Sequence, residues 1–201
     1  MGYRTIAKPA VHKTVVGYST FIASVSEIQN ETEVRAFLAG AKEAYPQANH
    51  YCYAYVLGEG KNQLSYFSDA GEPSGSAGRP ILNSLLSARL TNTSIVVARY
   101  FGGKKLGIPG LIAAYRVAAD NVIAVAEICV RTPHVTVMAK LEYSQLDRMR
   151  YLLRVYHCEE TLINFEATIQ IQLKIPEDVF PVVADEMRNI GIVLSYLDSH
   201  H

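Results

Sequence analysis

Two glycine-rich segments carry residue types that could bind or transform a substrate. "SDAGEPSGSAGRP" (residues 68–80) supplies acidic and hydroxyl side chains, and "GGKKLGIPG" (residues 102–110) supplies two lysines. Each segment precedes an expected helix, whose free backbone amides and positive dipole end favour phosphate or carboxylate. The pattern predicts a shallow anion-receptive cleft where the two segments meet. In the alternative interpretation, the glycines only permit tight turns and close packing of helix on sheet.

A nucleotide-binding loop is not expected in the second segment. Gly102 and Gly107 have the spacing of a Walker A loop, but Ile108 and Pro109 stand where its Lys and its Ser or Thr belong.

Arg99 lies in "SIVVARYF" (residues 94–101), whose apolar and β-branched residues predict a central strand. A guanidinium buried in such a strand needs a carboxylate partner. Asp69 and Glu72 are the candidates for this partner. The pair would be either a structural clasp or part of a site. If the site is catalytic, one of the two carboxylates would act as base and Arg99 would hold an anion.

His50 and Cys52 lie two residues apart on one face of an expected strand. A Cys–His pair can supply a nucleophile and its base. Side chains at this spacing are about 6.5 Å apart along a strand, which is too far for direct activation. The spacing favours core or site-lining residues over a catalytic pair.

Composition limits the class of protein. The 201 residues are 49% hydrophobic and 19% charged, with a formal net charge of zero, which suits a soluble globular protein. Apolar runs fall short of the roughly 20 residues that span a bilayer. The three cysteines form no CxxC pair, which argues against a disulfide scaffold or a zinc site. We therefore expect a cytoplasmic protein with no metal, no cofactor and no membrane association.

Periodicity predicts mixed strands and helices in the first two thirds of the chain. Asn30 and Glu33 form a capping-box pattern at the start of a helix that ends before Pro46. Pro80 suits the first turn of another helix. The expected strands are 18–28, 50–58, 64–67 and 94–101, and the two later helices are 81–90 and 111–127.

The pattern restarts after residues 129–134. Strands are expected at 134–142, 158–165, 167–175 and 191–197, and helices at 144–156 and 177–190. This βαββαβ order is ferredoxin-like. We therefore expect an α+β fold of two domains, residues 1–131 and 134–201.

Charge differs between the two parts. Residues 1–133 contain 13 basic and 9 acidic side chains, whereas residues 134–201 contain 6 and 10. RNA-binding domains are usually basic because they neutralise phosphates. The neutral whole and the acidic second domain therefore do not favour RNA as the partner.

The motifs "SDAGEPSGSAGRPIL", "VVARYFGGKKLGIPGLIAAY" and "HYCYAY" together resemble the signature of the YigZ/IMPACT family, in its bacterial branch. The resemblance implies an N-terminal α/β domain like those of RNase PH and ribosomal proteins, and a ferredoxin-like C-terminal domain similar to the last domain of elongation factor G. It also implies a link to translation, because eukaryotic relatives regulate translation by binding the activator of an initiation-factor kinase. Bacterial relatives have no settled activity.

The chain departs from the family pattern at three places. Ala70 stands where a second aspartate is common, and Tyr51 replaces an asparagine. The segment around Pro109 and Ala113 lacks the arginine that the family carries there, which reduces the expected affinity for a simple anion.

The leading hypothesis is a cytoplasmic regulatory protein linked to translation, which recognises a protein, a ribosome or RNA through the cleft. The alternative is a hydrolase-like enzyme that acts on a phosphate-bearing or peptide substrate in the same cleft. The expected ligand-binding residues are Ser68, Asp69, Glu72, Ser74, Gly75, Ser76, Gly78, Arg99, Gly102, Gly103, Lys104, Lys105, Gly107 and Gly110. The expected site-lining residues are His50, Cys52 and Tyr115.

Overall fold

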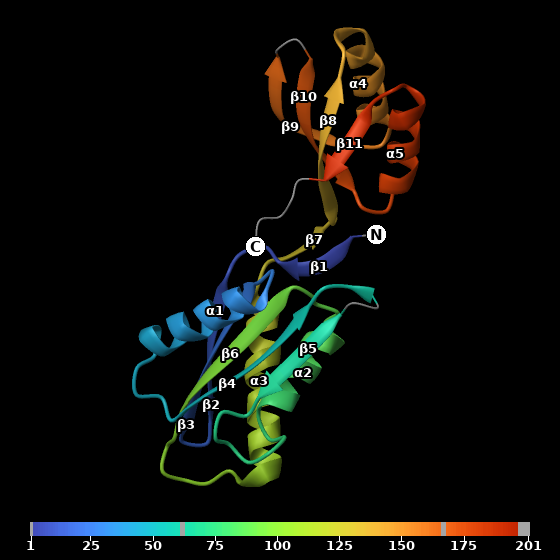
Figure 1. Cartoon of the computed structure of the whole chain (residues 1–201). Coiled ribbons are helices and arrows are strands. Elements are labelled where there is room, and N and C mark those ends of the chain that lie inside the picture. Colours follow the sequence, from blue (N-terminus) through green and yellow to red (C-terminus); the bar gives the residue numbers. More distant parts are fainter. Residues whose placement is uncertain (1, 61–62, 166–167, 197–201) are drawn as a thin grey trace. The chain divides into compact units, whose positions relative to one another are not determined.

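The chain divides into two compact units, one of Tyr3–Arg131 and one that starts at Thr132. The structure, a computed structural model, describes residues 2–60, 63–165 and 168–196 (Figure 1). Each unit has its own hydrophobic core. The α+β fold class expected from the sequence is confirmed.

A five-stranded antiparallel sheet forms the base of the larger unit. Its strand order is β2-β3-β6-β4-β5, so β6, which contains Arg99, is the central strand that the sequence predicts. Residues 50–57 and 64–68 pair as the expected hairpin. The strands are β2 (Ala10–Val16), β3 (Ser19–Glu27), β4 (His50–Leu57), β5 (Leu64–Ser68) and β6 (Thr93–Tyr100).

Three helices cover the two faces of this sheet. Helix α1 (Glu31–Ala44) lies on one face, and α2 (Gly78–Ser87) and α3 (Gly107–Val125) lie on the other (Figure 1). Strand alternation divides the side chains accordingly. Cys52 and Ala54 enter the main core with α2 and α3, whereas Tyr53 and Tyr55 pack with α1. The side chains of His50 and Arg99 therefore project on the side of α2 and α3.

Two helices of the larger unit begin earlier than the sequence predicts. Helix α2 begins at Gly78 and α3 at Gly107, whereas apolar periodicity alone begins at 81 and 111. By length and composition, α3 could also cross a membrane. Its Leu111, Tyr115 and Val122 are buried in the main core, so we interpret it as a core helix.

Three strands have no counterpart in the sequence-based prediction. β1 (Tyr3–Ile6) pairs with β7 (Ile128–Arg131), and β2 pairs with β3. The β1–β7 pair joins segments that are more than 120 residues apart, and no local pattern reveals such a partner.

The smaller unit has the predicted βαββαβ order. Its four antiparallel strands are arranged β11-β8-β10-β9, and two helices pack with the sheet. The elements are β8 (His134–Leu141), the 3₁₀ turn η2 (Tyr143–Gln145), α4 (Leu146–Val155), β9 (Glu159–Phe165), β10 (Ile169–Pro176), α5 (Phe180–Asn189) and β11 (Val193–Tyr196). The end of the last expected strand, residue 197, lies outside the described residues. The likeness of the two domains to RNase PH and to elongation factor G stays a prediction.

We predict that residues 1–131 fold alone, because they hold a complete sheet and its core. A fragment that ends at residue 126 should lose about 1–3 kcal/mol of unfolding stability, since it lacks β7 and the packing of Ile128. Circular dichroism and urea denaturation of the two fragments would measure this difference. An unfolded or insoluble 1–131 fragment would contradict the prediction.

Candidate functional site

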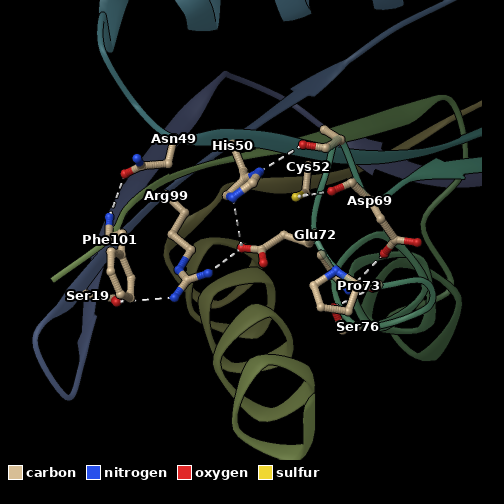
Figure 2. Close-up of polar contacts among 12 residues, drawn as sticks. Ser19, Asn49, His50, Cys52, Asp69, Glu72, Pro73, Ser76, Arg99 and Phe101 are labelled. Carbon is tan, nitrogen blue, oxygen red and sulfur yellow. Dashed lines mark hydrogen bonds and ion pairs between the residues drawn. The ribbon is translucent and has the colours of Figure 1, made fainter. Parts of the chain in front are cut away.

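The two glycine-rich loops meet at a buried ion pair. Arg99 is only 5% exposed, and its Nη1 donates to Oε1 of Glu72 at 2.5 Å (Figure 2). Glu72 comes from the loop that precedes α2, and Arg99 stands at the end of β6, where the second loop begins. The structure confirms that Arg99 is buried and paired, and it selects Glu72 over Asp69.

Further donors surround the carboxylate of Glu72. The Tyr115 hydroxyl donates to Oε1 at 2.8 Å, and Nε2 of His50 lies 4.0 Å from the same oxygen. The side chain of Glu72 is 4% exposed. The negative charge is therefore held in the protein interior by neighbours from three different elements.

Aromatic rings and a serine fix the guanidinium of Arg99. The rings of Phe21 and Phe101 each lie 5.5 Å from its Cζ. Ser19 Oγ accepts from Nη2 at 3.4 Å. Arg99 Nε is buried and has no hydrogen-bond partner among the described residues.

Asp69 has a different role from the expected one. Its Oδ1 accepts from the amides of Ala77 and Gly78, both at 2.9 Å, and its Oδ2 accepts from Gly75 at 2.8 Å. The chain's own carboxylate thus occupies the N-terminus of α2, the position that an external anion was expected to take. As a result, the amides of Gly75 and Gly78 are not available to a ligand.

Two further residues of the first loop are structural. Ser76 is fully buried and donates to the carbonyl of Pro73 at 2.6 Å, so its hydroxyl cannot serve as a ligand contact. A Cβ on Gly78 would lie 2.7 Å from the carbonyl oxygen of Ser68. The close-packing alternative therefore holds at Gly78. Ser74 lies exposed on the loop surface.

In the second loop, close packing requires a glycine at position 102, and most of the other residues are exposed. A Cβ on Gly102 would lie 1.7 Å from the carbonyl oxygen of Tyr18, so only glycine fits there. Its amide donates to Ser19 Oγ at 3.3 Å. Gly103 and Lys104 are exposed, and Gly110 is half-buried.

Cys52 is not poised as a nucleophile. It is fully buried, and its thiol donates to the Asp69 carbonyl at 2.9 Å and to the Tyr115 hydroxyl at 3.3 Å. Burial raises the pKa of Cys52 to about 12, against the lowering effect of the Tyr115 hydrogen bond and with a further rise from the Glu72 charge. A thiol with this pKa carries almost no thiolate at neutral pH. His50 directs its Nδ1 to the carbonyl of Ala70 at 2.9 Å, so the two side chains have separate partners.

Tyr115, which was expected to line the site, lies beneath it in the core. Burial raises the pKa of its hydroxyl, and the neighbouring Cys52 and Glu72 raise it further. The hydroxyl stays protonated and donates to Glu72.

A cleft of about 350 Å³ opens above the ion pair, between the two loops. Its lining is mainly apolar, with one exposed lysine at its edge. The lining residues are Glu72, Pro73, Arg99, Phe101, Lys105, Leu106, Gly107, Ile108 and Leu111.

The chain matches the family model described as the Impact N-terminal domain over residues 17–123. It is 36% identical over 176 residues to the IMPACT family member YvyE of Bacillus subtilis, covering 84% of this chain and 80% of that protein. The chain belongs to the IMPACT family.

Other IMPACT family members are similar over the same extent. Identity is 33% to a member from Haemophilus influenzae, covering 84% of this chain and 82% of the relative. It is 32% to YigZ of Escherichia coli, covering 84% of each chain. A solved structure described as a hypothetical protein matches with a TM-score of 0.72 and 25% identity, over 99% of this chain and 98% of the other.

Sequence reasoning about this IMPACT protein missed Ser19 and Asn49. Ser19 connects Arg99 to Gly102, and Asn49 Oδ1 accepts from the Phe101 amide at 2.7 Å. Strand pairing brings both residues next to the second loop, although neither is close to it in sequence. A polar residue at a strand end was the one available signal, and such residues are common.

We predict that Arg99→Ala lowers the free energy of unfolding by about 3–5 kcal/mol, because it leaves the Glu72 carboxylate buried without its cation. Urea denaturation followed by circular dichroism would measure the loss. Arg116→Ala is the matched control, since Arg116 forms an exposed pair with Asp120 on α3. The control should lose less than about 1 kcal/mol. A loss as small for Arg99→Ala would contradict the account of the ion pair.

Proposed function

We propose that this protein is a cytoplasmic regulator that binds a protein component of the translation machinery through the cleft between its two glycine-rich loops. The observation that carries the proposal is the cleft itself, which has apolar walls over a neutralised ion pair. The proposed link to translation comes from membership of the IMPACT family, because the resemblance implies that its eukaryotic members regulate translation.

The walls of the cleft favour a protein partner. Phe101 is 44% exposed and Ile108 is 54% exposed, although both are apolar. A volume of about 350 Å³ accommodates one or two side chains of a partner segment. Burying such residues on binding would remove apolar surface from water, which is favourable by about 25 cal/mol per Å².

RNA fits the cleft less well. The pair of Glu72 and Arg99 is neutral as a unit, and Lys105 is the one lysine in the lining. Affinity for nucleic acid comes largely from neutralising several phosphates. A single lysine beside apolar walls suits a protein segment better.

The state of the polar groups favours binding over catalysis. Glu72 Oε1 already accepts from Arg99 and Tyr115, and the raised pKa of Cys52 keeps its thiol protonated. Asp69, the other candidate base, holds three backbone amides. Each of these groups already forms hydrogen bonds within the chain, which favours a structural role over a catalytic one.

Co-sedimentation of the full chain with purified ribosomes would test the proposal. Ile108→Glu places a charge in the cleft wall and should weaken binding by about tenfold or more. Val117→Glu is the matched control, because Val117 is an exposed apolar residue of the same helix and is absent from the cleft lining. The control should bind like the unaltered chain.

Salt dependence separates protein from RNA contacts in the same experiment. Binding carried by phosphate contacts falls steeply between about 50 and 200 mM salt. We expect a shallow dependence. No binding, equal binding by both variants, or a steep loss with salt would each overturn the proposal.

A further inference from the structure

We propose that the outer edge of β2 binds an extended acidic segment of another polypeptide as a sixth strand of the five-stranded sheet. The segment would carry an acidic side chain opposite Lys13 and an apolar side chain on either side of that position. Residues of β2 take no part in the lining of the cleft between the glycine-rich loops. The inference therefore goes beyond the proposed function and does not depend on it.

One side of the β2 backbone has no partner in the sheet. β2 is an edge strand that pairs with β3 alone, in an unbroken register from Ala10 to Val16. Among the described residues, no backbone hydrogen bond joins its other side to another element. Proline, a β-bulge or short length commonly keeps an edge strand from pairing. β2 has seven residues, without a proline or a bulge, so its outer N–H and C=O groups can extend the sheet.

The side chains of β2 alternate between the two faces of the sheet. Thr14 is buried on the side of α3, where its hydroxyl accepts from Nδ2 of Asn121 at 3.1 Å. Val11, Lys13 and Val15 therefore project on the side of α1. Val11 is 54% exposed and Val15 is 60% exposed, so two uncovered apolar side chains flank the lysine. A strand that pairs with β2 would cover them and remove their surface from water.

An apolar groove of about 460 Å³ lies beside this row of side chains, between the start of β2 and α1. Three of the α1 residues that line it are small, namely Ala36, Gly40 and Ala44. A Cβ on Gly40 would meet no atom within 4 Å, so there is open space at the surface of the helix. Val11 also lines the groove. A side chain of an added strand that packs beside Val11 can therefore enter it.

The charge of Lys13 determines which strand fits. If two copies of the chain paired antiparallel over the whole of β2, Lys13 would lie opposite the same lysine of the other copy. Like charges at opposed positions destabilise a strand pair, whereas a carboxylate opposite Lys13 stabilises it. Residues 1–133 also carry more basic than acidic side chains, 13 against 9, which attracts an acidic partner at longer range. An acidic segment therefore fits this edge better than a second copy does.

NMR titration of the full, ¹⁵N-labelled chain with synthetic peptides would test the inference. The probe is Thr-Val-Thr-Glu-Thr-Val-Thr with both ends blocked, and the comparison peptide has lysine in place of glutamate. We expect the glutamate peptide to bind about fivefold more tightly, or better, because of the charge opposite Lys13. With the peptide bound, every second amide of β2 should exchange with solvent at least about tenfold more slowly, because alternate amides face the added strand.

Backbone methylation separates strand addition from contact through side chains alone. Two further glutamate peptides carry N-methyl groups, one on its even-numbered and the other on its odd-numbered residues. An added strand turns only alternate N–H groups toward its neighbour. We therefore expect one methylated peptide to lose its binding and the other to bind like the unmodified peptide. Equal affinity of the two methylated peptides would overturn the inference.

Two pairs of variants test the charge and the groove separately. Lys13→Glu should reverse the preference, so that the lysine peptide binds more tightly than the glutamate peptide. Lys140→Glu is its control, because Lys140 is an exposed strand lysine of the smaller unit. Gly40→Leu fills the groove and should weaken the glutamate peptide by about threefold or more, although leucine favours a helix more than glycine does. Ala39→Leu, on the same helix but outside the groove lining, should bind like the unaltered chain.

Three further results would overturn the inference. The first is the absence of shifts in the β2 amides at about 1 mM glutamate peptide. The second is equal affinity for the glutamate and lysine peptides. The third comes from sedimentation velocity of the chain alone: a dimer that dissociates when the peptide binds would show that β2 pairs with a second copy. Ribosome binding that depends on Ile108 is measured separately, so the proposed function can stand or fail without this inference.

Discussion

The buried ion pair between Glu72 and Arg99 is the interaction on which the site depends. It joins a loop that follows an edge strand to the end of the central strand, across 27 residues of sequence. Two buried charges are stable only when further partners satisfy them. Tyr115, Ser19 and the rings of Phe21 and Phe101 provide these partners. Because these partners come from β3, α3 and the second loop, the ion pair fixes the positions of several elements relative to one another.

The two glycine-rich loops look alike in sequence and differ in structure. Both lead into a helix N-terminus, yet the side chain of Asp69 caps the first, whereas the second has no side-chain cap among the described residues. The first loop therefore supplies the acidic partner and one wall of the cleft, and the second supplies the lysine and the opposite wall. A single cleft results, in place of two equivalent anion sites.

Much of this arrangement could be predicted from the sequence. An arginine in a β-branched apolar segment indicated a buried ion pair, and its two candidate partners included the observed one. Asp69 was misjudged because a carboxylate six to nine residues before the amides it binds gives no periodic signal. The roles of Ser19 and Asn49 depend on strand pairing, and β1 and β7 pair across most of the larger unit. Local patterns do not encode these distant contacts.

The central claim is that one ion pair holds both loops in place. Amide hydrogen exchange by NMR on Glu72→Gln tests it most directly, because loop amides that make hydrogen bonds report on each side of the cleft. These are Gly75 and Gly78 in the first loop, and Phe101 and Gly102 in the second. We expect exchange to accelerate by about tenfold or more in both loops, with α1 unchanged. Acceleration in the first loop alone, or in neither, would contradict the account.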